Sequence, residues 1–453
     1  MNSVMHAAAR PPAPADDAAA LAQLCREAVA QCRAAGANEA SASSHLRRSL
    51  AVGVRHGEVE TLTRRLDRQL VVRAQVGRSL GVASTADFDP GSVRQTVAKA
   101  CAIARLAEPD VFNGLPDPTL YPTEAPELDL WHPWALEVDE AVELARGIEA
   151  AGREEEGITN SDGAEVESGS VLRGYANSHG FVGRRRESWH ELSCSLLAGH
   201  GEGMQRGSWY DIARAPGDLE LPGRIGRLAA ERALARLGAR GLGTRQCPVL
   251  FVPELARGLL GHFVAAVEGK ALYNGATLYA DHLGKRLFPA FVRLVEHPHL
   301  ARGMASAVFD EEGVATQGSL LVDGGVLQRY VLDSYAARKL GLRSTGNAGG
   351  VRNLLLEPGM HGFQALLREM GTGLVVTQLM GQGVSPVSGN YSRGASGFWV
   401  EGGEIAYPVE GITIASNLRE MFLGIAAVGN DVDRRGAIAS GSILVERMTV
   451  AGT

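Results

Sequence analysis

The sequence predicts an α+β protein with two domains, the first an antiparallel sheet with helices and the second mainly β. Its 453 residues exceed the length of one ordinary domain. In the first half, stretches with helical periodicity alternate with groups of segments rich in β-branched residues. In the second half, short strand-like segments follow one another with glycines between them. We therefore expect a flexible N-terminal tail at residues 1–19, an α+β domain at 20–240 and a mainly β domain at 245–453.

The first domain is expected to open with a helix and an antiparallel meander. Asp16 and Asp17 precede an Ala- and Leu-rich stretch that ends near Gly36, and carboxylates and glycine suit the two ends of a helix in that order. The expected strands are Leu50–Arg55, Val59–Thr63, Gln69–Val76 and Ser79–Ala83, with turns at His56-Gly57, Arg65-Leu66-Asp67 and Gly77-Arg78. Asp89-Pro90 then begins a helix that should end near Leu106.

A connector, two helices and more strands should complete this domain. Five of the nineteen prolines fall between Leu115 and Pro133, which is typical of an extended connector. The elements expected after it are a helix at Val138–Glu155, strands within Ile158–Trp209 with turns at Ser161-Asp162-Gly163 and Asn177-Ser178-His179-Gly180, a helix at Leu221–Leu237 and a linker at Gly238–Gly243.

The second domain should begin with a short strand and a helix, and then continue as strands. Two glycine pairs, Asp323-Gly324-Gly325 and Glu401-Gly402-Gly403, are strong signals of tight hairpins. The expected elements are a strand at Val249–Val252, a helix at Glu254–Glu268, and strands at Ser319–Val322, Val326–Leu332, Gly373–Gln378, Gly397–Glu401, Ile405–Pro408 and Ile443–Val450.

Charge and composition exclude several classes of protein. The net charge of −6 argues against a nucleic-acid-binding protein, whose affinity rests on basic surface. No stretch approaches the ~20 apolar residues that cross a bilayer, so we expect no membrane association. The first fifteen residues lack the apolar run of a secretory signal, which favours a cytoplasmic protein. An odd number of scattered cysteines does not indicate a disulfide framework, and Cys25 and Cys32 should pack on one buried helix face.

Three histidine-containing segments are candidates for metal binding. His190 and Cys194 lie in a segment of alternating polarity, which places them about 13 Å apart on a strand at about 3.3 Å per residue, too far to share one ion. His297 and His299 flank a proline on an extended segment, and Asp310 could complete a site with them. His262 lies on the helix at Glu254–Glu268 without a second histidine one turn later, which favours a structural role.

The order of several motifs in the second half resembles the TldE (PmbA) family. The matching segments are Glu296–Leu300, Ser334–Gly350, Met370–Ser385, Tyr391–Val400 and Ile425–Asp431. Two segments of the first half, Ser161–Gly163 and Ser178–Phe181, match the same family more weakly. The resemblance extends over roughly residues 20–453.

This resemblance implies a non-catalytic subunit. Members of the family pair with a homologous TldD subunit, and the pair forms a cytosolic metallopeptidase. It degrades unstructured peptides and trims modified precursors, including microcin B17 and antitoxins. The TldD half holds zinc with a His-Glu-x-x-x-His helix and a later cysteine. The corresponding helix here, around Gly261–Glu268, has one histidine, and no cysteine follows Cys247 near Ser440-Gly441-Ser442. We therefore expect no catalytic residue and no metal ligand in this chain, and zinc in the partner subunit.

The resemblance and the polar, loop-borne character of certain residues together give a set of chamber-lining or substrate-binding candidates. An extended peptide would be held there by backbone hydrogen bonds at strand edges. The candidates are His297, His299, Gln382, Ser385, Tyr391 and Arg393. Two alternatives remain open: an autonomous metal-dependent hydrolase with its metal at His297 and His299, and a homodimeric peptide-binding module without proteolysis. The isolated chain could also form a homodimer through its pairing surface, because homologous subunits pair pseudo-symmetrically.

Overall fold

The computed structural model describes residues 17–452 and confirms the predicted α+β class. The predicted tail at residues 1–19 lies outside the described residues as far as residue 16, and a helix begins at Asp17. The chain divides into two compact units, each made of three segments, and the predicted domain boundary near residue 240 stays a prediction. Unit 1 is Met1–Arg48, Leu66–Leu115 and Ser170–Glu187, and unit 2 is Ser49–Arg65, Pro116–Gly169 and Ser188–Thr453.

The five predicted helices are present, and four further short helices of the described residues, all in the second half, were not predicted. Asp89 precedes the second helix, and its carboxylate accepts a hydrogen bond from the N–H of Gly91 at 2.8 Å, as an N-cap residue does. The helices are α1 (Asp17–Ala34), α2 (Pro90–Leu106), α3 (Val138–Arg153), α4 (Pro222–Leu234), α5 (Pro253–Ala266), α6 (Gly269–Tyr273), α7 (Ser334–Leu340), α8 (Phe363–Met370) and α9 (Leu418–Leu423). Within the predicted connector, only Pro118–Leu120 forms a short 3₁₀ turn.

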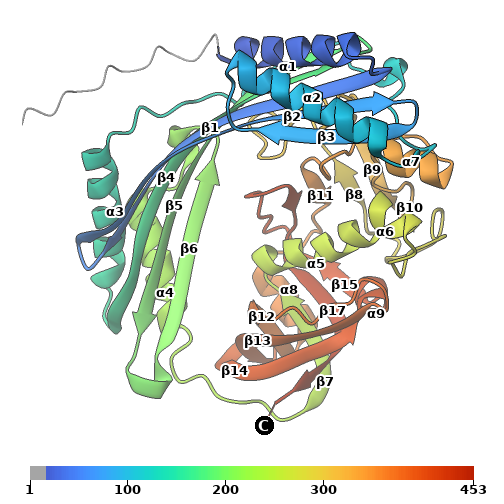
Figure 1. The fold of residues 1–453 in the computed structure, drawn as a ribbon. Helices are drawn as coiled ribbons and strands as arrows, with labels where there is room; N and C mark the ends of the chain where they lie inside the picture. The colour runs from blue at the N-terminus through green and yellow to red at the C-terminus, as the bar shows by residue number, and fades with distance from the viewer. Residues whose placement is uncertain (1–16, 453) are drawn as a thin grey trace, which may run out of the picture. The chain divides into compact units, whose positions relative to one another are not determined.

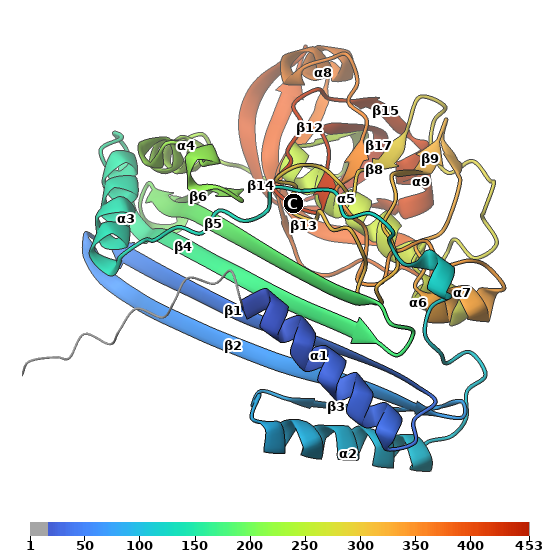
Figure 2. The same ribbon diagram turned by 90° about the horizontal axis from the view of Figure 1, so that it is seen from above.

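The first sheet has six strands in the order β3-β2-β1-β4-β5-β6. The pairs β2–β3 and β5–β6 are antiparallel. Figure 2 shows the long strands of this sheet side by side. The strands are β1 (Glu39–Arg55), β2 (Glu58–Val76), β3 (Ser79–Thr85), β4 (Ile158–Asn177), β5 (Val182–Ala198) and β6 (Gln205–Ala213).

Two predicted turns in this sheet are wrong. The segment Arg65-Leu66-Asp67 lies inside the uninterrupted strand β2, whose residues 58–69 are almost all exposed. A strand with both faces in solvent can carry charged residues at every position. Its sequence then lacks the alternation of apolar and polar residues and looks like that of a turn. Ser161-Asp162-Gly163 lies inside β4, where the Ser161 hydroxyl accepts from the N–H of Gly163 at 2.9 Å. Gly163 has a φ of +105°, so this stretch is a local irregularity in a continuing strand.

Unit 1 is built around small apolar side chains between its helices and strands. Helices α1 and α2 lie side by side, and α2 packs on β3 (Figures 1 and 2). Cys25 and Cys32 of α1 and Cys101 of α2 are at most 1% exposed and belong to one core cluster with Leu70. This confirms the predicted packing role of the first two cysteines. All five cysteines of the chain are unpaired.

In unit 2, α3 and α4 cross in close contact beside the strands β4–β6 (Figure 1). The crossing depends on two glycines. A Cβ at Gly226 would lie 2.0 Å from the carbonyl oxygen of Ile148, and one at Gly152 would lie 2.5 Å from the oxygen of Gly226. Since no side chain can occupy that space, the glycines set how closely the helix backbones approach.

The C-terminal part of unit 2 contains two further sheets. One has the order β14-β13-β12-β7-β17-β15, and β17 also pairs with β14, so five of its strands close into a ring. Its strands are β7 (Arg245–Phe251), β12 (Gly373–Met380), β13 (Asn390–Glu401), β14 (Glu404–Asn417), β15 (Ile425–Val428) and β17 (Ile443–Ala451). The other sheet, in the order β10-β9-β8-β11-β16, contains β8 (Leu294–Glu296), β9 (Ser319–Asp323), β10 (Val326–Leu327), β11 (Leu354–Leu356) and β16 (Ile438–Ala439).

Both predicted glycine hairpins are confirmed. Gly324 and Gly325 connect β9 to β10, Gly402 and Gly403 connect β13 to β14, and all four have positive φ. The predicted strand Val326–Leu332 is too long, because pairing as β10 ends at Leu327. Val331 instead exchanges backbone hydrogen bonds with the residues that follow α5, donating to the oxygen of Val267 at 3.0 Å.

Candidate functional site

Helix α5 (Figure 1) buries one face in the C-terminal part of unit 2, and two glycines lie on its opposite face. Pro253 lies in its first turn, where a missing N–H costs nothing. The opposite face carries Arg257, Gly258, Gly261 and His262. A Cβ added to either glycine would meet no other atom within 4 Å, so the backbone of this face is open to approach. The buried face consists of Ala256, Leu259, Leu260, Phe263 and Ala266.

His262 contacts Tyr391 of strand β13 and lies near Arg393 of the same strand. Its ring lies edge-on against Tyr391, with the ring centroids 6.2 Å apart. Burial lowers the pKa of His262, and the nearby positive charge of Arg393 lowers it further. The imidazole is therefore neutral near pH 7, with one nitrogen that donates a hydrogen bond and one that accepts.

Tyr391 and Arg393 are two residues apart on β13, so their side chains share a face of the strand. Tyr391 is 2% exposed, and burial raises the pKa of its hydroxyl to about 12, against the opposing effect of a hydrogen bond and a positive charge from Arg393. The Arg393 Nε is buried without a hydrogen-bond partner. Within residues 17–452, no carboxylate lies in ion-pair distance of this guanidinium.

One turn and a half before His262, Arg257 points to the C-terminal segment of the chain. Its guanidinium donates to the Tyr210 hydroxyl at 2.9 Å and lies 3.4 Å from the carboxylate of Asp433. Arg435 binds both oxygens of the same carboxylate at 3.0 Å. Burial alone would raise the pKa of Asp433, but the hydrogen bonds of Arg435 and the two positive charges hold it below its usual range.

The backbone of Asp433 pairs with Ser440, which brings another segment next to α5. The N–H of Asp433 donates to the oxygen of Ser440 at 3.0 Å. Ser440 and Ser442 are fully buried, and the Ser442 hydroxyl donates to Asp431 at 2.7 Å. Arg257, Asp433 and the Ser440–Ser442 segment are therefore close neighbours. Arg257 precedes His262, so a search for a second motif residue after His262 does not find it. Nothing in the neighbouring sequence indicates that Arg257 pairs with Asp433.

Four of the six predicted site residues come together at the connection between β12 and β13. Gln382 is exposed in this loop, and Val384 forms a bridge with Tyr391. The Ser385 hydroxyl accepts from the N–H of Ser388 at 3.2 Å, as a turn residue does. The loop therefore folds back on the start of β13 beside Tyr391 and Arg393.

The other two predicted residues, His297 and His299, lie after β8 and are separate from this group. His299 Nε2 is 3.1 Å from the Thr316 hydroxyl, and the oxygen of His297 accepts from the Asn353 side chain at 2.9 Å. In the described residues, no hydrogen bond, ion pair or ring contact joins either histidine to the β12–β13 group. A role for the six residues as a common chamber lining stays a prediction.

Asp310 was the acid that could complete a site with these histidines. Its carboxylate instead binds backbone N–H groups of nearby loops. Its carboxylate accepts from the N–H groups of Glu312 and Val314, both at 2.9 Å, and of Ala348 at 3.0 Å. Burial and the charge of Glu312 raise its pKa to about 7, against those three donors. These hydrogen bonds account for the carboxylate without a metal.

His190, the histidine of the segment Trp189–Cys194, lies on strand β5 as predicted. Nδ1 is 2.9 Å from the Ser168 hydroxyl and Nε2 is 2.9 Å from the backbone oxygen of His132. Burial lowers its pKa. With both nitrogens engaged in a fully buried position, His190 has a structural role.

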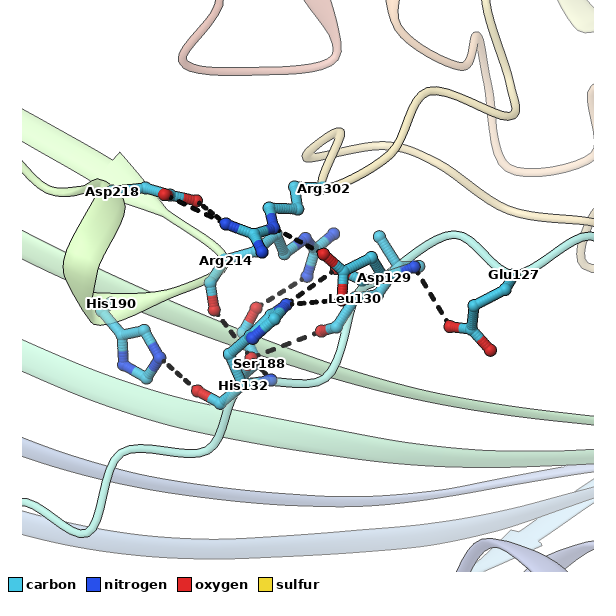
Figure 3. A network of polar contacts seen from close by, with 9 residues as sticks. All are labelled: Glu127, Asp129, Leu130, His132, Ser188, His190, Arg214, Asp218 and Arg302. Carbon is cyan, nitrogen blue, oxygen red and sulfur yellow. Dashed lines mark hydrogen bonds and ion pairs between the residues drawn. The ribbon is translucent and has the colours of Figure 1, made fainter.

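Figure 3 shows that this histidine belongs to a network that fixes the predicted connector in unit 2. Arg302 binds Asp129 at 2.6 Å and Asp218 at 2.9 Å, while Ser188 donates to the oxygen of Arg214 at 2.8 Å. The connector is therefore extended, as predicted, and is held by specific polar contacts.

A cavity of about 430 Å³ lies on the strands of the first sheet within unit 2. Glu60, Asp162, Glu165 and Glu191 line it together with Trp209. The pKa of Glu191 is raised by burial and by the charges of nearby glutamates. None of the six predicted site residues lines this cavity.

Comparison with known proteins identifies the family of this chain. Three family models match in order: the PmbA/TldA metallopeptidase domain 1 at residues 40–104, the central domain at 131–237 and the C-terminal domain at 244–452. The metalloprotease PmbA of Escherichia coli O157:H7 is 44% identical over 89% of this chain and 90% of its own length. The chain belongs to the PmbA/TldD metallopeptidase family.

Solved structures show the same fold. A putative modulator of DNA gyrase from Bacteroides thetaiotaomicron superposes with a TM-score of 0.90 at 24% identity, covering 95% of this chain and 98% of that one. TldE from Thermococcus kodakarensis superposes with a TM-score of 0.81 at 22% identity, covering 95% of this chain and 99% of that one. Among residues 17–452, no helix has the length and apolar character needed to cross a membrane.

Proposed function

We propose that this chain is the non-catalytic, TldE-like subunit of a two-subunit cytoplasmic metallopeptidase. A homologous TldD-like partner holds the zinc and supplies the chemistry. The substrates of the pair are unfolded peptides or modified peptides that need trimming. This chain completes the chamber in which an extended peptide is held.

The observation that carries the proposal is the sequence of helix α5. If His262 is taken as the last residue of a His-Glu-x-x-x-His motif, Arg257 and Gly258 stand where the first histidine and the glutamate would be. A guanidinium stays protonated at all relevant pH values and has no lone pair to give a metal. Glycine has no carboxylate to activate water. Of the three residues that the motif uses, two histidines and a glutamate, this helix keeps only the last histidine, His262.

The contacts of Arg257 support the same conclusion. Its positive charge pairs with Asp433, whose backbone pairs with Ser440. The segment Ser440–Ser442 is where the family's cysteine ligand is expected, and both serines are buried. Zinc sites in proteins use thiolate, imidazole and carboxylate ligands. Arginine and serine are not among these ligands, so the residues present would not fit a zinc ion.

The proposal is tested by reconstituting cleavage of an unfolded protein. The full chain and a TldD-like subunit from the same organism are purified separately and mixed. The pair should degrade a denatured substrate that neither subunit degrades alone, and a chelator should stop the reaction. Changing the partner's motif glutamate to glutamine should abolish cleavage, whereas His262→Asn in this chain should leave the zinc content of the pair unchanged. Chelator-sensitive cleavage by this chain alone, lost on substitution of His297 and His299, would instead identify an autonomous hydrolase.

A further inference from the structure

Arg393 carries a positive charge that the described part of the chain does not neutralise. It is partly buried on β13, and its Nε has no hydrogen-bond partner. The Tyr391 hydroxyl is the group to which it is hydrogen-bonded, and that hydroxyl is neutral because burial raises its pKa. The Nε is buried, and leaving a buried donor without a partner costs free energy, so a carboxylate is the ligand that would best satisfy this guanidinium.

The surroundings of Arg393 suit an anion better than any other ligand. His262 on α5 is close enough to Arg393 for the two groups to interact electrostatically, and it is neutral with an N–H to donate. On the same helix, Gly258 and Gly261 leave open space in which a second chain can approach. A guanidinium binds carboxylates through two parallel N–H bonds, which gives direction as well as attraction.

We propose that Arg393, with His262 beside it, binds a carboxylate of an extended peptide, and that this is the peptide's C-terminal carboxylate. The inference rests on the proposed function, in which the chain helps to hold peptides. Unfolded substrates share no side-chain pattern, but each of them ends in a carboxylate. A site that recognises that group is compatible with substrates of any sequence.

The test is a binding measurement on the full chain, alone and with its TldD-like partner. The probe is an unstructured ten-residue peptide with a fluorophore at its N-terminus, prepared as the free acid and as the C-terminal amide. Fluorescence anisotropy at low salt should give about tenfold tighter binding of the free acid, equivalent to about 1.4 kcal/mol. A third peptide, amidated but with aspartate as its last residue, distinguishes a side-chain carboxylate from the terminal one.

Matched variants assign this preference to one side chain. Arg393→Gln should reduce the ratio of acid to amide affinities to near one. Arg343→Gln removes the same charge from an exposed position and should leave the ratio unchanged. Arg393→Lys should give an intermediate ratio, because lysine keeps the charge and loses the paired N–H geometry. Circular dichroism and the thermal midpoint establish that each variant is folded.

Three results would overturn the inference: equal binding of acid and amide by the wild type, equal loss in Arg393→Gln and Arg343→Gln, or no peptide binding by chain or complex. Tight binding of the amidated aspartate peptide would keep the carboxylate site and reject the terminal group as its ligand. None of these results depends on the location of the zinc or on cleavage by the pair, so the proposed function stands or falls separately.

Discussion

Arg257 on α5 and Asp433 near the C-terminus form an ion pair, with Nη2 3.4 Å from Oδ2. The Asp433 side chain is 4% exposed and that of Arg257 is 16% exposed. The pair joins α5 to the segment whose backbone pairs with Ser440. Under the proposed function, Arg257 takes the position that a metal-binding histidine has in the TldD-like partner, and its charge is paired with Asp433.

The first prediction concerns the stability that this ion pair provides. Arg257→Met keeps an unbranched, flexible side chain and removes the charge and the hydrogen bond to Tyr210. Arg435 still binds Asp433, so the loss should be about 1–2 kcal/mol, smaller than for a buried carboxylate left without any partner. Urea unfolding followed by tryptophan fluorescence measures it. Arg343→Met, at an exposed position, is the control, and an equal effect of both variants would contradict the assignment.

A second prediction concerns the crossing of α3 and α4. Gly226→Ala would place a Cβ 2.0 Å from the Ile148 oxygen, so the helices must separate and the thermal midpoint should fall by several degrees. Gly147→Ala is a matched control on α3, because no atom lies within 4 Å of its added Cβ. There alanine should stabilise the helix by up to about 1 kcal/mol. Tolerance of alanine at Gly226 would show that the close approach is unnecessary.

The third prediction follows from the lowered pKa of His190. Above its unfolded pKa, near 6.5, the histidine is neutral in both states and contributes no pH dependence. As the pH falls below that value, the unfolded chain binds a proton that the folded chain does not, so stability is lost towards the folded pKa. The free energy of unfolding should therefore decline between pH 7 and pH 5. His190→Asn should flatten this decline. An unchanged slope in His190→Asn would refute the role of this side chain.

Elements with a chemical signal of their own could be predicted from the sequence. Asp89 predicts the start of α2 because its carboxylate can cap the first turn. The pairs Gly324-Gly325 and Gly402-Gly403 predict tight hairpins because glycine readily adopts the positive φ that these turns need. These features depend on residues within one turn of each other. They therefore do not depend on contacts with distant parts of the chain.

The length of the strands could not be predicted, because it depends on solvent exposure. β2 continues through Arg65-Leu66-Asp67 with both faces largely exposed. Its sequence there has no alternation of apolar and polar residues from which a strand could be predicted. β10 stops at Leu327 because the following residues pair with the end of α5 instead. Such competition between distant segments has no local signature.

The candidate site shows the same division. Tyr391 and Arg393 could be named as candidates from the sequence because they lie in one continuous segment that resembles the family, and their role in a site stays a prediction. The contact of Tyr391 with His262 and the pairing of Arg257 with Asp433 join residues far apart in the chain. Only the fold brings these partners together.

The most direct test of the central claim is the zinc content of the purified chain, measured by mass spectrometry before and after co-expression with a TldD-like subunit. We predict less than about a tenth of an equivalent in the chain alone and about one equivalent in the complex, since only the partner supplies a full ligand set. A full equivalent in the chain alone would contradict the account and would make His262, His297 and His299 the first ligands to mutate.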